Sequence, residues 1–162
     1  MDDIFALAES RNESPFIVVC DSLEDPHNLG AILRSAEAAG VHGVIIPKRN
    51  SVTLNYTVAK TSAGAIEYVP VVKVANLPAA IDELKSRGVW IFGADMDGTD
   101  YTALDYSGSI ALVIGSEGKG IGRLVREKGD FIASLPMRGK INSLNASVAA
   151  GILMFEAAKH RN

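Results

Sequence analysis

The stretch Ile110–Gly122 (IALVIGSEGKGIG) places four glycines after a continuous apolar run. Glycine tolerates positive φ angles and lets a ligand approach the main chain closely, so a strand ending in such a loop suits a nucleotide-sized ligand. The dinucleotide fingerprint would need glycine where Arg123 stands, and the Walker phosphate loop would need lysine where Ile121 stands. Glu117, a carboxylate between glycines, suits a ligand hydroxyl or cation. We therefore expect a ligand loop of neither standard type, with a merely structural turn as the alternative.

A second polar group occurs in Leu135–Ala150 (LPMRGKINSLNASVAA), where a Pro- and Gly-containing loop leads into an apolar helix. Ser143, Asn145 and Ser147 crowd the expected start of that helix. Capping of the free N–H groups at a helix start accounts readily for one such residue, but less readily for three of them together. The same free donors can bind a carboxylate or a ribose hydroxyl, so this helix start is a second candidate binding segment.

The third group is Asp25–Arg34 (DPHNLGAILR). With Asn28 as the N-cap of a helix, Arg34 falls in its second turn, near enough to face the same crevice. An arginine on an apolar, alanine-rich helix is a candidate binder of phosphate or carboxylate. An ion-paired or snorkelling Arg34 is an equally good interpretation of the sequence alone.

Six short apolar runs alternate with amphipathic segments, and this alternation predicts an α/β fold with a parallel sheet covered on both faces. The expected strands are Phe16–Cys20, Gly43–Ile46, Val69–Val74, Val89–Ala94, Ile110–Ile114 and Phe131–Leu135. The expected helices are Asn28–Ala39, Leu77–Arg87, Ile121–Glu127 and Leu144–Lys159, with a further helix in the middle of Ser51–Ala65.

The chain of 162 residues is long enough for one core, and its formal net charge of −3 excludes a uniformly basic nucleic-acid-coating protein. No apolar run approaches the length of a membrane span. The single cysteine, Cys20, ends an apolar run and is expected to be a packed side chain. The three scattered histidines predict no metal site. These features fit a reduced, cytoplasmic protein.

Basic side chains gather in two separated blocks. Residues 28–60 hold four basic groups and one acidic group, and residues 119–162 hold eight and three. If the fold brings the blocks together, they form a phosphate-binding face; ordinary solvated surface is the alternative. The blocks include Arg34, Lys48 and Lys60 in the first, and Lys119, Arg123 and Arg138 in the second.

Three motifs in order, N28-L-G-x-x-x-R34, L112-V-I-G-S-E-G-K-G120 and L135-P-M-x-G139 followed by S143-L-N-A-S147, resemble those of the SpoU family of 2′-O-ribose RNA methyltransferases, in the SPOUT superfamily. The resemblance runs from about Pro15 to Ala158. The stretches DPHNLGAILRSAEAAGVHGVIIPK and KTSAGAIEYVPV are most similar to the bacterial enzymes that methylate guanosine in large-subunit ribosomal RNA.

The resemblance implies a parallel six-stranded sheet whose C-terminal segment forms a deep trefoil knot, a rare exception to unknotted topology. It implies S-adenosyl-L-methionine as cofactor, RNA as substrate and a homodimer, with no membrane or metal partner. Given this resemblance, the residues that we expect to contact RNA are Arg34, Lys48, Lys60, Lys119, Arg123 and Arg138. The cofactor-binding residues that it implies are Ala94, Gly115, Ser116, Gly118, Leu135, Met137, Ser143 and Leu144. We expect residues 15–162 to be the catalytic domain, and residues 1–14 to be a linker or an N-terminal extension.

The family mechanism assigns the role of base to the arginine that matches Arg34. A guanidinium is effectively never deprotonated in proteins, so we expect Arg34 to bind the target phosphate and to stabilise the developing alkoxide. Glu117 is expected to hold Arg34 or the ribose, and Asn28, Ser143 and Asn145 to orient them.

Three other functions remain compatible with the sequence. They are transfer-RNA ribose methylation, a non-catalytic module that binds a nucleotide or an S-adenosyl ligand, and an ordinary flavodoxin-like nucleotide-binding domain. The −3 charge favours weak, salt-sensitive RNA binding by this chain alone.

Overall fold

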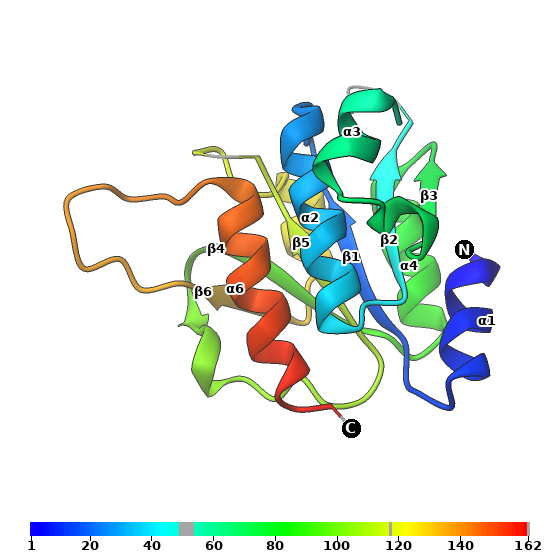
Figure 1. The fold of residues 1–162 in the computed structure, drawn as a ribbon. Helices are drawn as coiled ribbons and strands as arrows, with labels where there is room; N and C mark the ends of the chain where they lie inside the picture. The colour runs from blue at the N-terminus through cyan, green and yellow to red at the C-terminus, as the bar shows by residue number, and fades with distance from the viewer. Residues whose placement is uncertain (49–53, 117, 162) are drawn as a thin grey trace.

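A computed structural model describes residues 1–48, 54–116 and 118–161, and its centre is a six-stranded sheet in the order β3-β2-β1-β5-β4-β6 (Figure 1). All neighbouring strands pair in parallel. The strands are β1 (Phe16–Cys20), β2 (Gly43–Pro47), β3 (Val71–Val74), β4 (Trp90–Asp100), β5 (Ile110–Ile114) and β6 (Phe131–Ser134). The helices are α1 (Asp2–Ser10), α2 (Pro26–Ala39), α3 (Tyr56–Thr61), α4 (Leu77–Ser86), α5 (Arg123–Lys128) and α6 (Ala146–Ala158), with 3-10 turns η1 (Ala65–Glu67) and η2 (Tyr101–Ala103).

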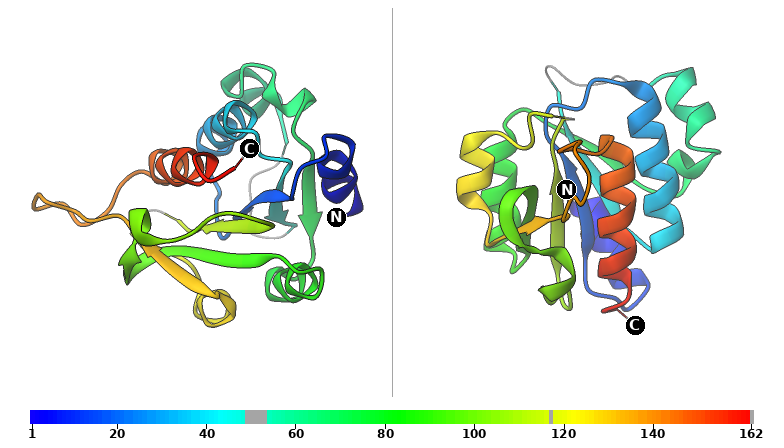
Figure 2. Two further views of the ribbon diagram at one scale, coloured as in Figure 1. Left: turned by 90° about the horizontal axis from the view of Figure 1, so that it is seen from below. Right: turned by 90° about the vertical axis from the view of Figure 1, so that its left-hand side faces the viewer.

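Helices cover both faces of this sheet, as Figure 2 shows. Side chains along a strand alternate between faces, so Phe16 and Val18 of β1 pack with α2 and α6, whereas Ile17 and Val19 pack with α1 and α4. Every residue of β1 and β5 is buried. This explains why both strands are unbroken apolar runs, and it confirms the predicted α/β architecture.

All six predicted strands are present, and the largest difference in their bounds is at β4. The apolar run ends at Ala94, but the strand continues to Asp100 through an irregularity between Ala94 and Thr99. The extension pairs with β6 through backbone groups (Thr99 with Ala133, Asp100 with Ser134), and such pairing does not depend on apolar side chains. Hydrophobic patterning therefore could not predict it.

The start of α2 differs from the prediction, which was wrong in making Asn28 the N-cap. The helix begins at Pro26, and Asp25 caps it by accepting a hydrogen bond from the backbone N–H of His27 at 2.9 Å. Proline suits the first helical position because its missing N–H would have no partner there. Asn28 therefore lies inside the first turn, where its side chain is available for other contacts.

The other predicted helices occur within about two residues of their expected bounds. The helix expected in the middle of residues 51–65 is α3, although residues 51–53 lie outside the described part of the chain. The expected linker or extension over residues 1–14 forms α1 for most of its length, with Ile4 and Ala8 buried. Ile4 packs so closely on Gly43 that a Cβ there would lie 2.3 Å from its Cγ1 atom. Two buried positions are too few to produce a clear helical pattern in the sequence.

Of the helices that the structure describes, none has the length and apolar character that crossing a membrane requires.

A buried histidine joins the entry of β1 to the start of β2. The Nδ1 atom of His42 accepts a hydrogen bond from the Phe16 N–H at 2.9 Å, and its Nε2 atom lies 3.1 Å from the Glu13 carboxylate. The Nδ1 contact requires an unprotonated Nδ1, because only a free ring nitrogen accepts. Burial lowers the pKa of His42 below its ordinary 6.5, and Glu13 opposes that effect in part.

We expect His42 to make folding sensitive to mild acid. Because its pKa is lower when folded than when unfolded, the unfolded state takes up the proton first as pH falls below about 6.5, and the free energy of unfolding then decreases. Urea unfolding between pH 7.5 and pH 5.5 measures this decrease. His42→Ala should cost about 1–3 kcal/mol at pH 7.5, since the Phe16 N–H loses its partner, and should flatten the pH dependence. Parallel pH profiles for the two proteins would contradict the assignment.

Candidate functional site

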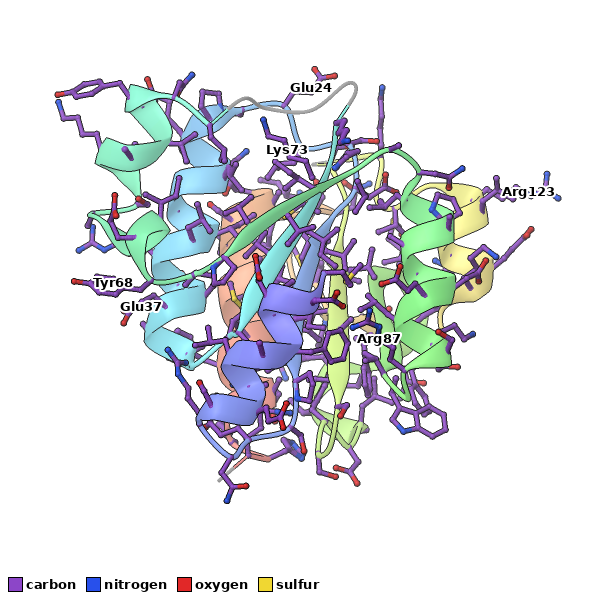
Figure 3. The ribbon with its side chains drawn as sticks, turned by 90° about the vertical axis from the view of Figure 1, so that its right-hand side faces the viewer. Glu24, Glu37, Tyr68, Lys73, Arg87 and Arg123 are labelled. Atoms are coloured by element: carbon purple, nitrogen blue, oxygen red, sulfur yellow. The ribbon has the colours of Figure 1, made fainter. Side chains whose placement is uncertain are left out.

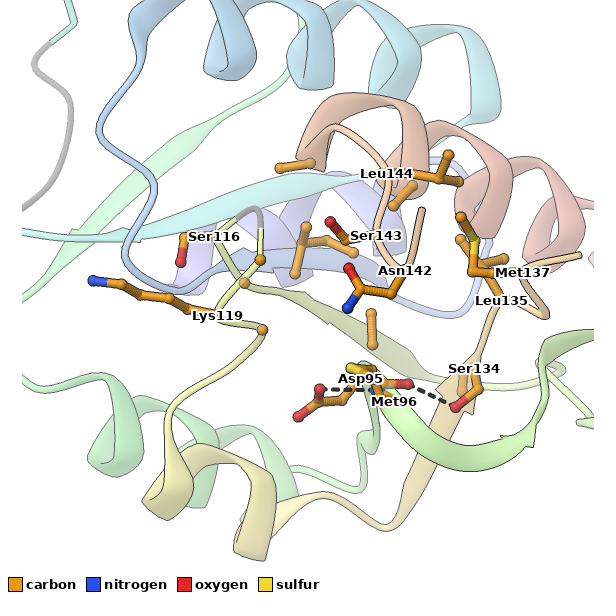
Figure 4. A pocket seen from close by; sticks show the side chains of 18 of the residues that line it. Asp95, Met96, Ser116, Lys119, Ser134, Leu135, Met137, Asn142, Ser143 and Leu144 are labelled. Atoms are coloured by element: carbon orange, nitrogen blue, oxygen red, sulfur yellow. Dashed lines mark hydrogen bonds between the residues drawn. The ribbon is translucent and has the colours of Figure 1, made fainter. Parts of the chain in front are cut away.

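A cavity of about 420 Å³ lies at the carboxyl ends of β4, β5 and β6 (Figure 4). Three segments line it: the turn after Ala94, the glycine loop after β5, and parts of the connection from β6 into α6. Ser116 and Lys119 lie on one side of the close-up and Met137 on the other, with Asn142 and Ser143 between them. Ligands of parallel α/β proteins bind at this edge of the sheet.

The glycine loop folds back on itself at the rim of the cavity. The Gly120 N–H donates to the Ser116 carbonyl at 3.0 Å, and the turn needs positive φ angles of 82° at Gly118 and 69° at Gly120. A Cβ on Gly115 would lie 2.1 Å from the Gly120 carbonyl oxygen. Glycine at position 115 is therefore a steric requirement, and the loop presents its main chain to the cavity.

Polar contacts fix the floor of the cavity beneath that loop. The Ser134 hydroxyl donates to the Asp95 carbonyl at 2.6 Å and accepts from the Gly98 N–H at 2.7 Å. The Asp95 carboxylate pairs with Arg126 at 2.7 Å, with the carboxylate side chain only 17% exposed. These contacts tie the extension of β4 to β6 and α5, so the floor is held in place without a ligand.

Asn145 connects two segments that are far apart in the sequence. Its Oδ1 atom caps α6 by accepting from the backbone N–H groups of Ser147 at 3.0 Å and Val148 at 3.3 Å. Its Nδ2 atom donates to Oδ1 of Asn28 at 3.1 Å, across the junction between α6 and α2. Capping is therefore confirmed for Asn145, whose second polar atom bonds to Asn28, and the binding of a ligand at this helix start stays a prediction.

The eight residues predicted to bind a cofactor all line this one cavity, although they come from all three of these segments. They are Ala94, Gly115, Ser116, Gly118, Leu135, Met137, Ser143 and Leu144. Their proximity is a structural finding, and their role as ligand contacts stays a prediction.

The predicted catalytic residues are only partly brought together. Ser143 lines the cavity, and Asn145 and Asn28 meet beside it. Arg34 does not line it; the Arg34 side chain lies on the part of α2 that faces α3 and borders a second cavity. Glu117 falls outside the described residues. We expected Asn28 and Arg34 to face one crevice of the same chain. In the structure, Asn28 lies beside the first cavity and Arg34 borders the second.

The six residues predicted to contact RNA are all exposed. Three of them, Lys48, Lys119 and Arg138, follow β2, β5 and β6, whose carboxyl ends share one edge of the parallel sheet. Arg123 begins α5, where its Nε atom pairs with Glu127 at 3.1 Å. Lys60 lies in the last turn of α3, which packs on α2, the helix that carries Arg34.

Sequence reasoning missed part of the lining, namely Asp95, Met96, Asp97 and Ser134. Predicting these four residues would have required the order of the strands in the sheet, which the sequence does not reveal. Once β4 is known to lie between β5 and β6, the residues after Ala94 must face the same edge as the glycine loop.

Cys20 takes no part in this site. It is fully buried, and burial raises the pKa of its thiol to about 12, so the thiol stays protonated and unreactive near neutral pH. Among residues 1–48, 54–116 and 118–161, no cluster of three His, Cys, Asp or Glu side chains is arranged to hold a metal ion.

Comparisons with known sequences identify relatives over almost the whole chain. The model of the SpoU rRNA Methylase family matches residues 15–155. The Bacillus subtilis protein YacO, named for the TrmH family of tRNA/rRNA methyltransferases, is 55% identical over 163 residues, which cover 100% of this chain and 66% of YacO. A Staphylococcus aureus (strain COL) protein with the same family name is 57% identical over 147 residues, 90% of this chain and 59% of its own. The chain thus spans about 59–66% of the length of these relatives.

Solved structures with the same fold include methyltransferases crystallised with AdoMet. The SpoU methyltransferase AviRb from Streptomyces viridochromogenes, in complex with the cofactor AdoMet, is 30% identical with a TM-score of 0.84, covering 91% of this chain and 60% of its own. The AdoMet-bound rRNA methyltransferase from Sinorhizobium meliloti is 31% identical with a TM-score of 0.85, covering 91% and 57%. The A. aeolicus TrmH/SpoU tRNA modifying enzyme is 29% identical with a TM-score of 0.82, covering 98% and 82%.

The tight loop at Gly115 allows a matched pair of variants. Gly115→Ala should lower the free energy of unfolding by about 1–3 kcal/mol, because the new methyl group overlaps the Gly120 backbone, which cannot rotate away as a side chain can. Gly139→Ala, in the exposed β6–α6 connection with no atom within 4 Å of the added Cβ, should change it by less than about 0.5 kcal/mol. Urea unfolding of both variants is the measurement; equal effects would show that the loop can open at no cost.

Proposed function

Because the chain belongs to the SpoU rRNA methylase family, we propose that it binds S-adenosylmethionine in the cavity beside β5 and transfers a methyl group to a ribose 2′-hydroxyl of RNA. The observation that carries this proposal is the convergence of the glycine loop, the turn after Ala94 and the start of α6 on one cavity. The hydrogen bond between Asn28 and Asn145 adds the remaining motif to the same place.

The residues present fit the proposed cofactor. A volume of about 420 Å³ lies in the range of small-molecule sites, and Gly115, Gly118 and Gly120 line it with main chain that carries no side chain. Apolar walls at Leu135, Met137 and Leu144 suit an adenine ring. The Asp95 carboxylate is already paired with Arg126, so the exposed carboxylate of Asp97 is the group at this rim that favours a ligand carrying positive charge.

When bound, the cofactor supplies an electrophilic methyl group, so the protein must hold a ribose oxygen in line with it and provide for the proton that leaves. Asn145 has both its Oδ1 and its Nδ2 engaged, so its orientation is fixed before any substrate arrives. In the proposed reaction, Asn145, Asn28 and Ser143 orient the ribose, and Glu117 holds Arg34 or the ribose.

Arg34 acts in this proposal as a permanent cation, which binds the phosphate of the target nucleotide and stabilises the developing alkoxide. The proton leaves through that phosphate or through water. Because Arg34 does not line the cavity of its own chain, we assign it to the cavity of a second subunit.

A homodimer supplies that second subunit. Helix α6 exposes Val148, Ile152 and Phe155, with exposed fractions of 50%, 36% and 49%. Their spacing of four and then three residues puts them on one helix face, which suits burial against another apolar surface. This face lies on the helix that Asn145 caps, so the proposed interface adjoins the site.

We further propose a C-terminal trefoil knot, a cytoplasmic location, and guanosine in large-subunit ribosomal RNA as the target. Support for the target is the similarity of residues 25–48 and 60–71 to the bacterial guanosine enzymes. A target in transfer RNA is the alternative, since the relatives are named for both kinds of RNA.

Calorimetry tests the cofactor, and methylation mapping tests the reaction. S-adenosylmethionine and S-adenosylhomocysteine should each bind the folded chain at one site per protomer, and Gly115→Ala should weaken both because it disturbs the loop. Ribose methylation mapped on total RNA from cells with and without the gene should reveal one missing 2′-O-methyl group, which identifies the RNA. If neither S-adenosyl compound binds folded protein, the proposal is wrong.

Mixing two inactive variants tests whether Arg34 serves the other subunit. Arg34→Ala leaves the cavity intact, and Asn145→Asp keeps a good helix cap while removing the Nδ2 donor. Each variant alone should be close to inactive. If Arg34 acts across the dimer, the mixed dimer holds one intact site and should regain about half of the wild-type turnover. Turnover no higher than that of the separate variants would place Arg34 in the site of its own chain.

A further inference from the structure

A second cavity of about 300 Å³ lies on the other side of α2, between this helix and the segment that follows α3. It is lined by three large side chains, those of Arg34, Glu37 and Tyr68, and by four small residues, Ala38, Ser62, Ala63 and Ala65. We call it the Tyr68 cavity. No part of the proposed reaction so far uses Glu37 or Tyr68.

The two charged groups of the Tyr68 cavity are not used to stabilise the chain. Arg34 and Glu37 are one helical turn apart on α2, yet within the described residues neither makes an ion pair or a side-chain hydrogen bond. Arg126 and Arg87, by contrast, pair with carboxylates. A guanidinium and a carboxylate thus border one hollow with their hydrogen-bonding groups free for a ligand.

Tyr68 adds an aromatic wall. It is 68% exposed, and Figure 3 shows it beside Glu37 at the edge of the molecule. In the part of the chain that the structure describes, no other ring and no cation contacts its ring. Single-stranded nucleic acids bind proteins by stacking bases on exposed rings of this kind.

We propose that the Tyr68 cavity binds a guanine base of the substrate RNA, stacked on Tyr68, with its Watson–Crick edge at Glu37 and a phosphate of the same strand at Arg34. This inference rests on the proposed function only in taking single-stranded RNA as the ligand. It adds a base-recognition site to the reaction and assigns a role to two residues that had none.

Guanine is the base that the chemistry of Glu37 selects. A carboxylate accepts two parallel hydrogen bonds, and guanine offers two adjacent donors on its Watson–Crick edge, N1–H and N2–H. Adenine, cytosine and uracil do not offer two adjacent donors there. The other lining residues are small and leave space for a flat ring: three are alanines, and the hydroxyl of the fourth, Ser62, already donates to the Ala59 carbonyl at 2.9 Å.

The position of Arg34 connects this site to the proposed reaction. A nucleotide whose base lies in the Tyr68 cavity brings its phosphate to the same guanidinium that we assign to the target phosphate. The base would therefore belong to the target nucleotide or to its immediate neighbour. Recognition of the base and stabilisation of charge at the ribose would then share one arginine.

Titration with mononucleotides tests the site directly, with amide chemical shifts as the readout. Guanosine 5′-monophosphate should shift the amides of residues 62–68, and adenosine 5′-monophosphate should bind at least about tenfold more weakly. Inosine 5′-monophosphate, which lacks the N2 amino group, should fall between them. Shifts confined to the cavity beside β5, or equal affinity for the three nucleotides, would overturn the proposal.

Variants separate stacking from hydrogen bonding. Tyr68→Ala should weaken guanosine monophosphate at least about fivefold, whereas Tyr68→Phe should stay within about twofold because the ring remains. Glu37→Gln should reduce the preference for guanine over adenine, with a smaller effect on adenosine monophosphate. Tyr56→Ala is the matched control, since Tyr56 is an exposed tyrosine (77%, against 68% for Tyr68), on α3, that does not line the Tyr68 cavity. A loss in the Tyr56 variant equal to that in Tyr68→Ala would overturn the assignment.

A parallel measurement of S-adenosylmethionine binding and RNA methylation keeps this inference separate from the proposed function. Tyr68→Ala should bind the cofactor normally and should raise KM for RNA more than it lowers kcat. Unchanged KM with normal methylation would reject the guanine site alone. Failure of the wild-type chain to bind S-adenosylmethionine, with nucleotide binding intact, would reject the methyltransferase assignment alone.

Discussion

The arrangement depends on one constraint: β1 and β5 are adjacent, parallel and buried on both faces. Their other neighbours also pair in parallel, and helices cover both faces of the sheet, as is usual for parallel sheets. Because every pair in the sheet is parallel, all six carboxyl ends point to one edge. The irregular stretch of β4 after Ala94 and the loops after β5 and β6 therefore converge, although the sequence separates them. The cavity is a consequence of this geometry, because side chains of one strand could not enclose it.

The backbone at that edge of the sheet adopts unfavourable conformations where it forms the cavity. Gly118 and Gly120 adopt positive φ angles, and the non-glycine residue Asp97 also has a positive φ of 58° in the turn after Ala94. Such backbone is costly unless its surroundings hold it, and here the hydrogen bonds of Ser134 and the ion pair of Arg126 do so. The site is thus rigid for reasons that lie outside its lining, in α5 and β6. A ligand would meet a largely preformed cavity.

The sequence predicts the fold well because buried parallel strands are continuous apolar runs, and Phe16–Cys20 and Ile110–Ile114 have the same bounds in the structure. It fails where backbone pairing acts without a hydrophobic signal, as in the extension of β4 to Asp100. It also fails at Asn28, because a capping-type residue near a helix start does not reveal which residue caps, and Asp25 with Pro26 is the better pair. The cavity that Arg34 borders depends on which elements pack on each side of α2. The hydrophobic periodicity of the sequence does not reveal that packing.

The position of Arg34 also changes how the charge of the chain should be understood. A net charge of −3 argues against broad RNA binding, but binding needs only a few cations placed where phosphates pass. Lys119 borders the cavity beside β5, and Arg34 borders the Tyr68 cavity, so helix α2 separates two cationic groups of one chain. In the proposed reaction one RNA strand must reach a cavity beside β5 and a Tyr68 cavity at the same time. A second subunit can bring two such cavities together, whereas a single chain does not. Specificity would then come from the relative position of two shallow sites more than from tight binding at either, which suits an acidic protein that must release its RNA after each turnover.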